Sequence, residues 1–414
     1  MTVARSAGGD LPSGAWLGRA VAEGLRESGD RVALVHGERR LTGAQVLAMV
    51  ASGADRLAGL GVRPGGAVAC LYGESPESLV ARLAALALGC GFVHLVRDVP
   101  VPVAAATMRE LGAAALLWDP AREADAGPLL DACPVPIRRR LDTGLFPAPP
   151  PGRAGEPAVA MPVPDDPDAV SVVMFSSGTT GRRKAVAYGH RTEAAHLAAA
   201  RAIFGPGPWR LLAAPRTRYV PGLFALWTLA GGGAVVLEPA LDDAARMAAL
   251  VARERITHVM AGRPPEVYGL ARELDAPLDG LRQLVYGGTP PHPSRTAEAA
   301  RRLGPVLTQT YGTTEGGFLT VLPPADHRCA DLLGSAGRAV PGVDLRVRDT
   351  GGADLPPGET GEVWVRTPQA MLGHLGACGA GGASRGVRDG WLRTGDLGRL
   401  NDEGYLFLSG RAGR

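Results

Sequence analysis

Short apolar segments alternate with amphipathic ones through the first three quarters of the chain, and this alternation constrains the fold more than any other feature. Segments of strand length include 67–72 (AVACLY), 92–96 (FVHLV) and 169–177 (AVSVVMFSS). The sequence after the first of them is typical of a helix that Ser75 caps and that has Pro76 at its first position. Repeated strand–helix units predict an α/β fold with largely parallel sheets covered by helices.

The last quarter of the chain has a different pattern. Beyond about residue 316, segments of alternating polarity such as 344–349 (DLRVRD) and 404–410 (GYLFLSG) are separated by Gly- and Pro-rich turns. They predict a small antiparallel, barrel-like unit. The expected division of the chain is a first α/β subdomain at 1–145, a proline-rich linker at 146–167, a second α/β subdomain at 168–330 and the antiparallel subdomain at 331–414.

Charge and cysteine content exclude several classes of protein. The net charge of +3 is small and the basic residues are scattered, so we expect no nucleic-acid partner. Five cysteines without a CxxC pair suggest neither a disulfide framework nor a zinc site, as in a reducing cytoplasm. Charged and small residues interrupt the apolar run 79–96, which predicts a buried helix and strand instead of a membrane span. We therefore expect a cytoplasmic protein, of undetermined oligomeric state.

Nine residues at 176–184, SSGTTGRRK, follow a predicted buried strand and precede a predicted long helix. A glycine-rich turn at such a place can direct backbone N–H groups, hydroxyls and a cation at a phosphate. A flexible surface turn has the same composition, and the segment alone does not decide between the two. It is not a Walker A loop, because Ala185 follows Lys184 where that motif requires Ser or Thr.

Three further segments supply what a nucleotide site would need. YGGT (286–289) and QTYGTTEGG (309–317) end predicted strands, and ligands of open α/β sheets lie beyond the carboxyl ends of strands. The third, WLRTGDLGRLNDEGYLFLSGR, covers 391–411. The segments offer hydroxyls, an aromatic face, an acidic group for Mg²⁺ and an aspartate suited to ribose hydroxyls. The presence of these three segments in the same chain favours the phosphate-binding interpretation of 176–184.

In this order and spacing the four segments resemble the adenylate-forming superfamily, which includes acyl- and aryl-CoA ligases, peptide-synthetase adenylation domains and luciferases. The resemblance extends from about Asp30 to the end of the chain. It implies the N-terminal core of these enzymes, an α/β fold of two helix-covered, largely parallel sheets with a small antiparallel barrel-like subdomain. The alternative is a catalytically impaired nucleotide- or acyl-binding homologue with a regulatory or scaffolding role. A P-loop hydrolase or kinase does not fit the motif spacing.

The resemblance implies roles for the residues at matching positions. Tyr311 would stack on adenine, Asp396 and Arg411 would hold the ribose, and Glu315 would be the Mg²⁺ carboxylate. Thr314 and Lys184 would contact the phosphates during catalysis, with Lys184 supporting the mobile loop. The implied ATP-binding residues are Ser176, Ser177, Gly178, Thr179, Thr180, Gly181, Gly287, Gly288, Thr289, Tyr311, Gly312, Thr313, Asp396 and Arg411.

The implied reaction has two steps. A carboxylate oxygen attacks the α-phosphorus of ATP, which releases pyrophosphate and leaves an acyl-adenylate. Both reactants are anionic, so Mg²⁺ and the donors of the loop must offset their repulsion. The thiol of CoA or of a carrier-protein phosphopantetheine then attacks the activated carbonyl.

The sequence departs from the family pattern at several positions. Arg183 and Ala185 stand where the family usually has Pro and Gly, which predicts altered closure of the loop. Val220 stands where members that activate amino acids carry an aspartate, so an α-amino acid substrate is disfavoured. The candidate acid pocket mixes small and aromatic residues and favours an aryl or medium-sized carboxylate. Its residues are Tyr219, Val220, Gly222, Leu223, Gly262 and Tyr286.

The largest departure is at the end of the sequence. In the family, the glycine and arginine at Arg411 precede a hinge and a C-terminal domain that carries the catalytic lysine of adenylation. The chain ends at Arg414, so we expect either a truncation at the hinge or a natural end there. In both cases we expect ATP and acid binding with weak adenylation.

Overall fold

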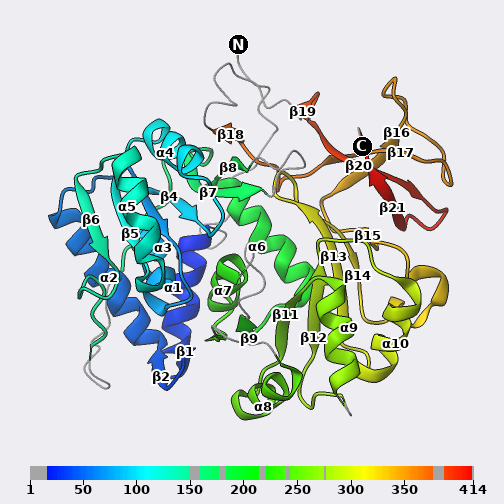
Figure 1. Ribbon diagram of the computed structural model, residues 1–414, viewed down its shortest axis with the longest axis horizontal. Coiled ribbons are helices and arrows are strands. Elements are labelled where there is room, and N and C mark those ends of the chain that lie inside the picture. The colour runs from blue at the N-terminus through cyan, green and yellow to red at the C-terminus, as the bar shows by residue number, and fades with distance from the viewer. Residues whose placement is uncertain are drawn as a thin grey trace.

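The computed structural model describes residues 16–149, 159–176, 183–213, 221–238, 243–274, 277–375 and 387–412. Within these ranges it contains two large β-sheets, a smaller antiparallel sheet and ten α-helices. Figure 1 shows helices α6 (His190–Phe204) and α7 (Pro221–Ala230) between the two large sheets, with the antiparallel sheet beside the second of them. This is the expected α/β class with a small antiparallel unit.

The first large sheet has the strand order β18-β8-β7-β4-β3-β5-β6 in the described part of the chain. The strands β7, β4, β3, β5 and β6 run parallel to one another, whereas β8 pairs antiparallel with both β7 and β18. All five residues of β3 are buried, as expected for a parallel strand covered on both faces. The strands are β3 (Ala67–Leu71), β4 (Gly91–Leu95), β5 (Ala113–Trp118), β6 (Ile137–Arg140), β7 (Val170–Ser176), β8 (Lys184–Gly189) and β18 (Gly373–Leu375).

The second large sheet has the order β15-β14-β13-β12-β11-β9-β10-β1-β2 over the described residues. Its six central strands are parallel, and β2, β14 and β15 are antiparallel. The strands are β1 (Val32–His36), β2 (Arg39–Thr42), β9 (Arg210–Ala213), β10 (Ala234–Leu237), β11 (His258–Gly262), β12 (Gln283–Gly287), β13 (Leu307–Thr313), β14 (Gly317–Leu322) and β15 (Arg338–Ala339). Both sheets draw strands from either side of 146–167, and the expected division of the chain remains a prediction.

Three apolar clusters hold these layers together. The largest lies between the sheets and combines α1 (Leu17–Ser28), α2 (Gly43–Gly59), α3 (Pro76–Ala87), α6 and α7 with strand residues of both sheets. The second packs α8 (Ala244–Glu254), α9 (Pro264–Glu273) and α10 (Pro293–Leu303) on the other face of the second sheet. The third packs α4 (Val101–Glu110) and α5 (Glu123–Ala132) on the first sheet. No helix of the described residues is long and apolar enough to cross a membrane.

The antiparallel sheet has the order β16-β17-β20-β19, with β21 paired to β20. Val347 and Val363 are buried on its inner face, while arginines and tryptophans alternate with them on the outer face. There the guanidinium of Arg348 lies over the rings of Trp364 and Trp391. The strands are β16 (Asp344–Arg348), β17 (Gly361–Arg366), β19 (Val387–Arg388), β20 (Trp391–Leu400) and β21 (Leu406–Arg411).

One strand is not apparent from the sequence. Between 176–184 and the expected long helix, which is present as α6, the chain forms β8, which pairs antiparallel with β7 from Ser176↔Lys184 to Val170↔Gly189. Five of the six β8 residues are buried, so this short segment gains more from a place inside the sheet than from extending α6. By contrast, the cap at α3 is confirmed, because the Ser75 hydroxyl accepts from the Ser78 N–H and Pro76 begins the helix.

Candidate functional site

Two parallel strands of the second sheet end side by side at the candidate site. Gly287 at the end of β12 is opposite Thr310 in β13, and a side chain at Gly287 would place its Cβ 2.2 Å from the Thr310 carbonyl oxygen. Gly312 has an equally close neighbour in the Gly317 carbonyl oxygen. Gly288 has a φ of 82°, which glycine adopts readily, and Thr289 is exposed. Gly287 and Gly312 therefore allow neighbouring backbone to pack closely, and Gly288 and Thr289 follow at the exposed end of β12.

A buried carboxylate joins this edge to the antiparallel sheet. The Tyr311 hydroxyl donates to Asp396 Oδ2 at 2.7 Å, and Arg411 Nε lies 2.8 Å from Asp396 Oδ1. Asp396 and Arg411 are direct partners of the β20–β21 ladder, which fixes their side chains on one face. Burial raises the pKa of Asp396, against the lowering effects of the Tyr311 hydrogen bond and the Arg411 charge. The pKa of Tyr311 is raised by burial and by the neighbouring Asp396, so the phenol remains a donor.

The loop expected to hold phosphates connects β7 to β8. Its predicted residues Ser177, Gly178, Thr179, Thr180 and Gly181 lie outside the described part of the chain. Ser176 ends β7 with a buried hydroxyl that has no hydrogen-bond partner among the described residues. Lys184 starts β8 with an exposed side chain, and it is the only lysine in the sequence.

The turn between β13 and β14 carries Thr313, Thr314 and Glu315. The Thr313 hydroxyl accepts from the Gly316 N–H at 2.9 Å, and the Tyr188 hydroxyl donates to the Thr314 carbonyl oxygen. Tyr188 belongs to β8, so the turn is tied to the strand that follows the loop.

The segment before β18 also binds this turn. The Met371 N–H donates to the Glu315 carbonyl oxygen at 2.9 Å, and His374 Nε2 lies 3.3 Å from Glu315 Oε1. Burial would raise the pKa of Glu315, but hydrogen bonds from His374 and from its own backbone, and the charges of His374 and Lys184, hold that pKa below its usual value. Glu315 is therefore an ionised carboxylate near neutral pH.

Sequence reasoning missed Tyr188 and His374. Neither residue lies in a segment that resembled a nucleotide motif, and their role at the turn depends on β18 pairing with β8. No feature of the short sequence GHL predicts that pairing. The charge of Lys184 helps to lower the pKa of Glu315, and the Glu315 carboxylate helps to raise the pKa of Asp396.

The candidate acid pocket is only partly described. Tyr219 and Val220 lie outside the described residues. Gly222 and Leu223 are in the first turn of α7, and Gly262 ends β11 opposite Tyr286 of β12. Tyr286 itself is buried in the second apolar cluster, where its hydroxyl is 2.9 Å from His327 Nε2.

The buried His94 and the partly buried Tyr72 lie beside Gly222. A Cβ at Gly222 would be 3.2 Å from His94 Cε1 and 3.5 Å from the Tyr72 hydroxyl, and the rings of Tyr72 and His94 are stacked. Any side chain larger than hydrogen at residue 222 would therefore push against these rings.

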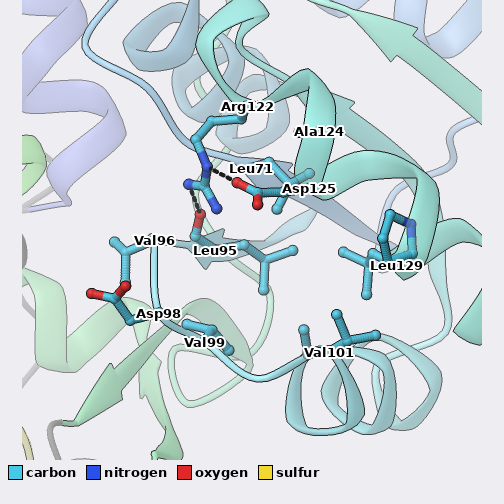
Figure 2. A pocket seen from close by; sticks show the side chains of 12 residues that line it. Leu71, Leu95, Val96, Asp98, Val99, Val101, Arg122, Ala124, Asp125 and Leu129 are labelled. Carbon is cyan, nitrogen blue, oxygen red and sulfur yellow. Dashed lines mark hydrogen bonds and ion pairs between the residues drawn. The ribbon is translucent and has the colours of Figure 1, made fainter.

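A cavity of about 120 Å³ lies apart from these residues, at the carboxyl edge of the first sheet. Figure 2 shows the Arg122 guanidinium inside it between Asp125 and the Leu95 carbonyl oxygen, at distances of 2.5 and 3.1 Å. Ligand pockets usually start at ~300 Å³. Because the cavity is smaller and its arginine already bonds protein atoms, we assign it a packing role.

Comparison with known proteins decides the family. A family described as AMP-binding enzyme matches residues 21–375. The chain belongs to this family of AMP-binding enzymes. Feruloyl-CoA synthase of an Amycolatopsis species is 31% identical over 95% of this chain and 78% of that protein. Indoleacetate–CoA ligase of Aromatoleum aromaticum is 31% identical over 90% of this chain and 74% of that protein.

A solved structure extends the likeness to three dimensions. The amide bond synthetase McbA of Marinactinospora thermotolerans superposes with a TM-score of 0.83 and 36% identity, over 96% of this chain and 79% of that one. The chain thus spans about four fifths of the length of this amide bond synthetase. The expected adenylate-forming superfamily and its fold are confirmed, and the chain is homologous to acyl- and aryl-CoA ligases.

Proposed function

We propose that this chain binds ATP, Mg²⁺ and a carboxylic acid, and activates the acid as an acyl-adenylate with release of pyrophosphate. The observation that carries the proposal is the Tyr311–Asp396–Arg411 network at the end of β13, with the Glu315 carboxylate on the following turn. The aromatic ring of Tyr311 suits adenine, and the buried carboxylate of Asp396 suits ribose hydroxyls. The ionised carboxylate of Glu315 suits a phosphate-bound metal.

The residues would act as follows. The backbone of Gly287 and Gly288, at and just after the end of β12, would line an adenine that stacks on Tyr311. Asp396, held by Arg411, would accept hydrogen bonds from the ribose hydroxyls. Thr314, on the turn between β13 and β14, and Lys184, at the start of β8, would contact the phosphates. These donors would offset the charge that develops as the acid's carboxylate attacks the α-phosphorus.

The donor set also fits Mg²⁺. This ion keeps several waters and usually binds through one or two carboxylates together with substrate phosphates. Glu315 is ionised and only partly buried, and the described residues contain no cluster of three or more acidic, histidine or cysteine groups that would make a dedicated metal cage. When bound, Mg²⁺ would neutralise phosphate charge and make pyrophosphate a better leaving group.

An aryl or other medium-sized acid is the proposed substrate class. Val220 cannot pair with an α-ammonium group, which argues against amino acids. The names of the two CoA-ligase relatives concern aromatic acids, ferulate and indoleacetate. Both points favour a ring-bearing carboxylate over an amino acid.

The acceptor of the activated acyl group is proposed to be a thiol, either CoA or a carrier-protein phosphopantetheine. The likeness to McbA, named as an amide bond synthetase, gives an amine as the second candidate. The two acceptors differ in the product, a thioester or an amide, and a direct comparison of them is therefore informative.

Acid-dependent pyrophosphate release, with hydroxylamine to trap the adenylate, tests the proposal. The panel should hold aryl, fatty and amino acids, and each acid should be assayed with this chain and with a fusion that adds a CoA-ligase C-terminal domain after Arg414. We expect release with aryl acids, stronger in the fusion. CoA, a carrier protein and a simple amine are then offered in turn as acceptors.

If neither protein releases pyrophosphate with any acid of the panel while ATP still binds, acid activation would be contradicted. It would favour the alternative of a catalytically impaired nucleotide- or acyl-binding homologue with a regulatory or scaffolding role.

A further inference from the structure

His374 occupies a place that no expected role explains. It lies in β18, a three-residue strand whose sequence neighbours belong to the antiparallel unit but which pairs with β8 at the edge of the first sheet. His374 is opposite Val186, and Leu375 is opposite Ala185. This pairing brings the imidazole beside the strand that starts with Lys184.

Hydrogen bonds hold the backbone around His374 against both β8 and the Glu315 turn. The Leu372 N–H donates to the Ala187 carbonyl oxygen at 2.8 Å, and the Met371 N–H donates to that of Glu315 at 2.9 Å. Gln369, only 1% exposed, makes two hydrogen bonds to the backbone of Phe318, which follows the Glu315 turn. The position of the imidazole is therefore set by both β8 and the turn.

Within the described residues, His374 is the side chain that hydrogen-bonds the Glu315 carboxylate, through Nε2 and Oε1 at 3.3 Å. Both side chains are partly buried, with exposed fractions of 19% and 25%. A donor to one carboxylate oxygen restricts rotation of the group and gives the other oxygen a fixed direction. Partners of this kind influence metal affinity without touching the ion.

We propose that His374 is a positioning residue that holds the Glu315 carboxylate for the Mg²⁺ that accompanies ATP. The inference rests on the proposed function, because it needs Glu315 to face the metal. It also gives β18 a role: the short strand couples the Glu315 turn to the strand after the phosphate loop. His374 itself contacts neither metal nor nucleotide in this account.

The test is the Mg²⁺ dependence of ATP binding, measured by titration calorimetry on the full chain with Mg²⁺ and with EDTA. We expect His374→Ala to weaken binding by about tenfold with Mg²⁺ and to leave binding in EDTA unchanged. His374→Gln keeps a donor of similar reach and should recover most of the affinity. His36→Ala, at the end of β1, controls for loss of a histidine elsewhere.

Two further measurements separate positioning from a merely structural role. In a Glu315→Gln background, His374→Ala should have no additional effect on Mg²⁺-dependent binding, since the two side chains act as one unit. Protection of Lys184 from acetylation by Mg²⁺-ATP, read by peptide mass spectrometry, should fall in His374→Ala at a fixed ATP concentration. Lys184 is the only lysine, so its peptide reports on this site alone.

Three outcomes would overturn the inference: unchanged Mg²⁺-dependent binding in His374→Ala, an equal loss with and without Mg²⁺, or a full effect that persists in the Glu315→Gln background. Failure of the unmodified chain to bind ATP with Mg²⁺ would instead overturn the proposed function, and this inference with it. If the unmodified chain binds ATP with Mg²⁺ and His374→Ala leaves that binding unchanged, this inference fails but the proposed function stands.

Discussion

Asp396 shows how one side chain can join two parts of the molecule. It accepts from the Tyr311 hydroxyl of the second sheet and pairs with Arg411 of the antiparallel sheet, so its carboxylate is held in one orientation. Preorganised hydrogen bonds to a charged group contribute about 1.5–3 kcal/mol each. The ribose site is therefore proposed to depend on the charge of this residue as well as on its shape.

Asp396→Asn should weaken AMP binding by about tenfold or more, because the amide loses the Arg411 ion pair and accepts hydrogen bonds less strongly. Titration calorimetry with AMP measures the change. Asp344→Asn is the matched control, since Asp344 pairs with Arg366 on the exposed face of the same sheet. An AMP affinity of Asp396→Asn equal to that of the control would refute the role in ribose binding.

Gly287→Ala should destabilise the fold by about 1–3 kcal/mol, because the new Cβ would lie 2.2 Å from the Thr310 carbonyl oxygen and force β12 and β13 apart. Gly269→Ala in α9 is the control: nothing lies within 4 Å of its added Cβ, and alanine favours the helix by about 0.5–1 kcal/mol. Urea unfolding of both variants measures these changes. Equal stabilities would show that the β12 edge is looser than the structure indicates.

A buried ion pair links helix α3 to helix α6. Arg82 and Glu193 are each 1% exposed, and the Ser171 hydroxyl of β7 donates to the second carboxylate oxygen of Glu193. Removing one partner of a buried pair leaves an uncompensated charge, which costs about 3–5 kcal/mol. This contact therefore couples two helices and a strand of the first sheet.

Arg82→Met and Glu193→Leu should each destabilise the protein by about 3–5 kcal/mol, and the double variant should lose less than the sum of the two. Urea denaturation of the four proteins gives the interaction free energy. Strict additivity would mean that the two side chains do not stabilise each other in solution.

Elements with strong periodicity could be predicted from the sequence, and elements defined by distant pairing could not. The strands 67–71 and 91–95 and the helix that Ser75 caps follow local rules of polarity and capping. Strand β18 follows none, because a three-residue strand with a glycine exists only through its pairing with β8. The same limit applies to the site: motifs indicated Tyr311, Asp396 and Arg411, whereas the roles of Tyr188 and His374 emerge only from the tertiary structure.

Buried histidines make the stability of the folded protein depend on pH. Burial, with the charges of Arg82 and Arg122, lowers the pKa of His94 to about 3, and burial with Arg82 lowers that of His196 to about 4. In the unfolded chain both groups titrate near 6.5. As the pH falls below 6.5 the unfolded chain binds protons that the folded protein does not, so acid destabilises the fold.

Between pH 6 and pH 5, each of these histidines should lower the free energy of unfolding by about 1.4 kcal/mol per pH unit. His196→Leu should reduce the measured slope by about that amount, whatever its effect on absolute stability. Chemical denaturation at several pH values provides the slope. An unchanged slope would mean that His196 is protonated or hydrated in the folded protein.

Isotope transfer shows whether a carboxylate oxygen of the acid attacks the α-phosphorus of ATP. An aryl acid carrying oxygen-18 in its carboxylate is incubated with Mg²⁺-ATP and the fusion that adds a C-terminal domain, and the nucleotide is analysed by mass spectrometry after hydroxylamine trapping. We expect AMP that contains one heavy oxygen atom, with unlabelled pyrophosphate. Labelled inorganic phosphate with ADP, or unlabelled AMP, would rule out this attack.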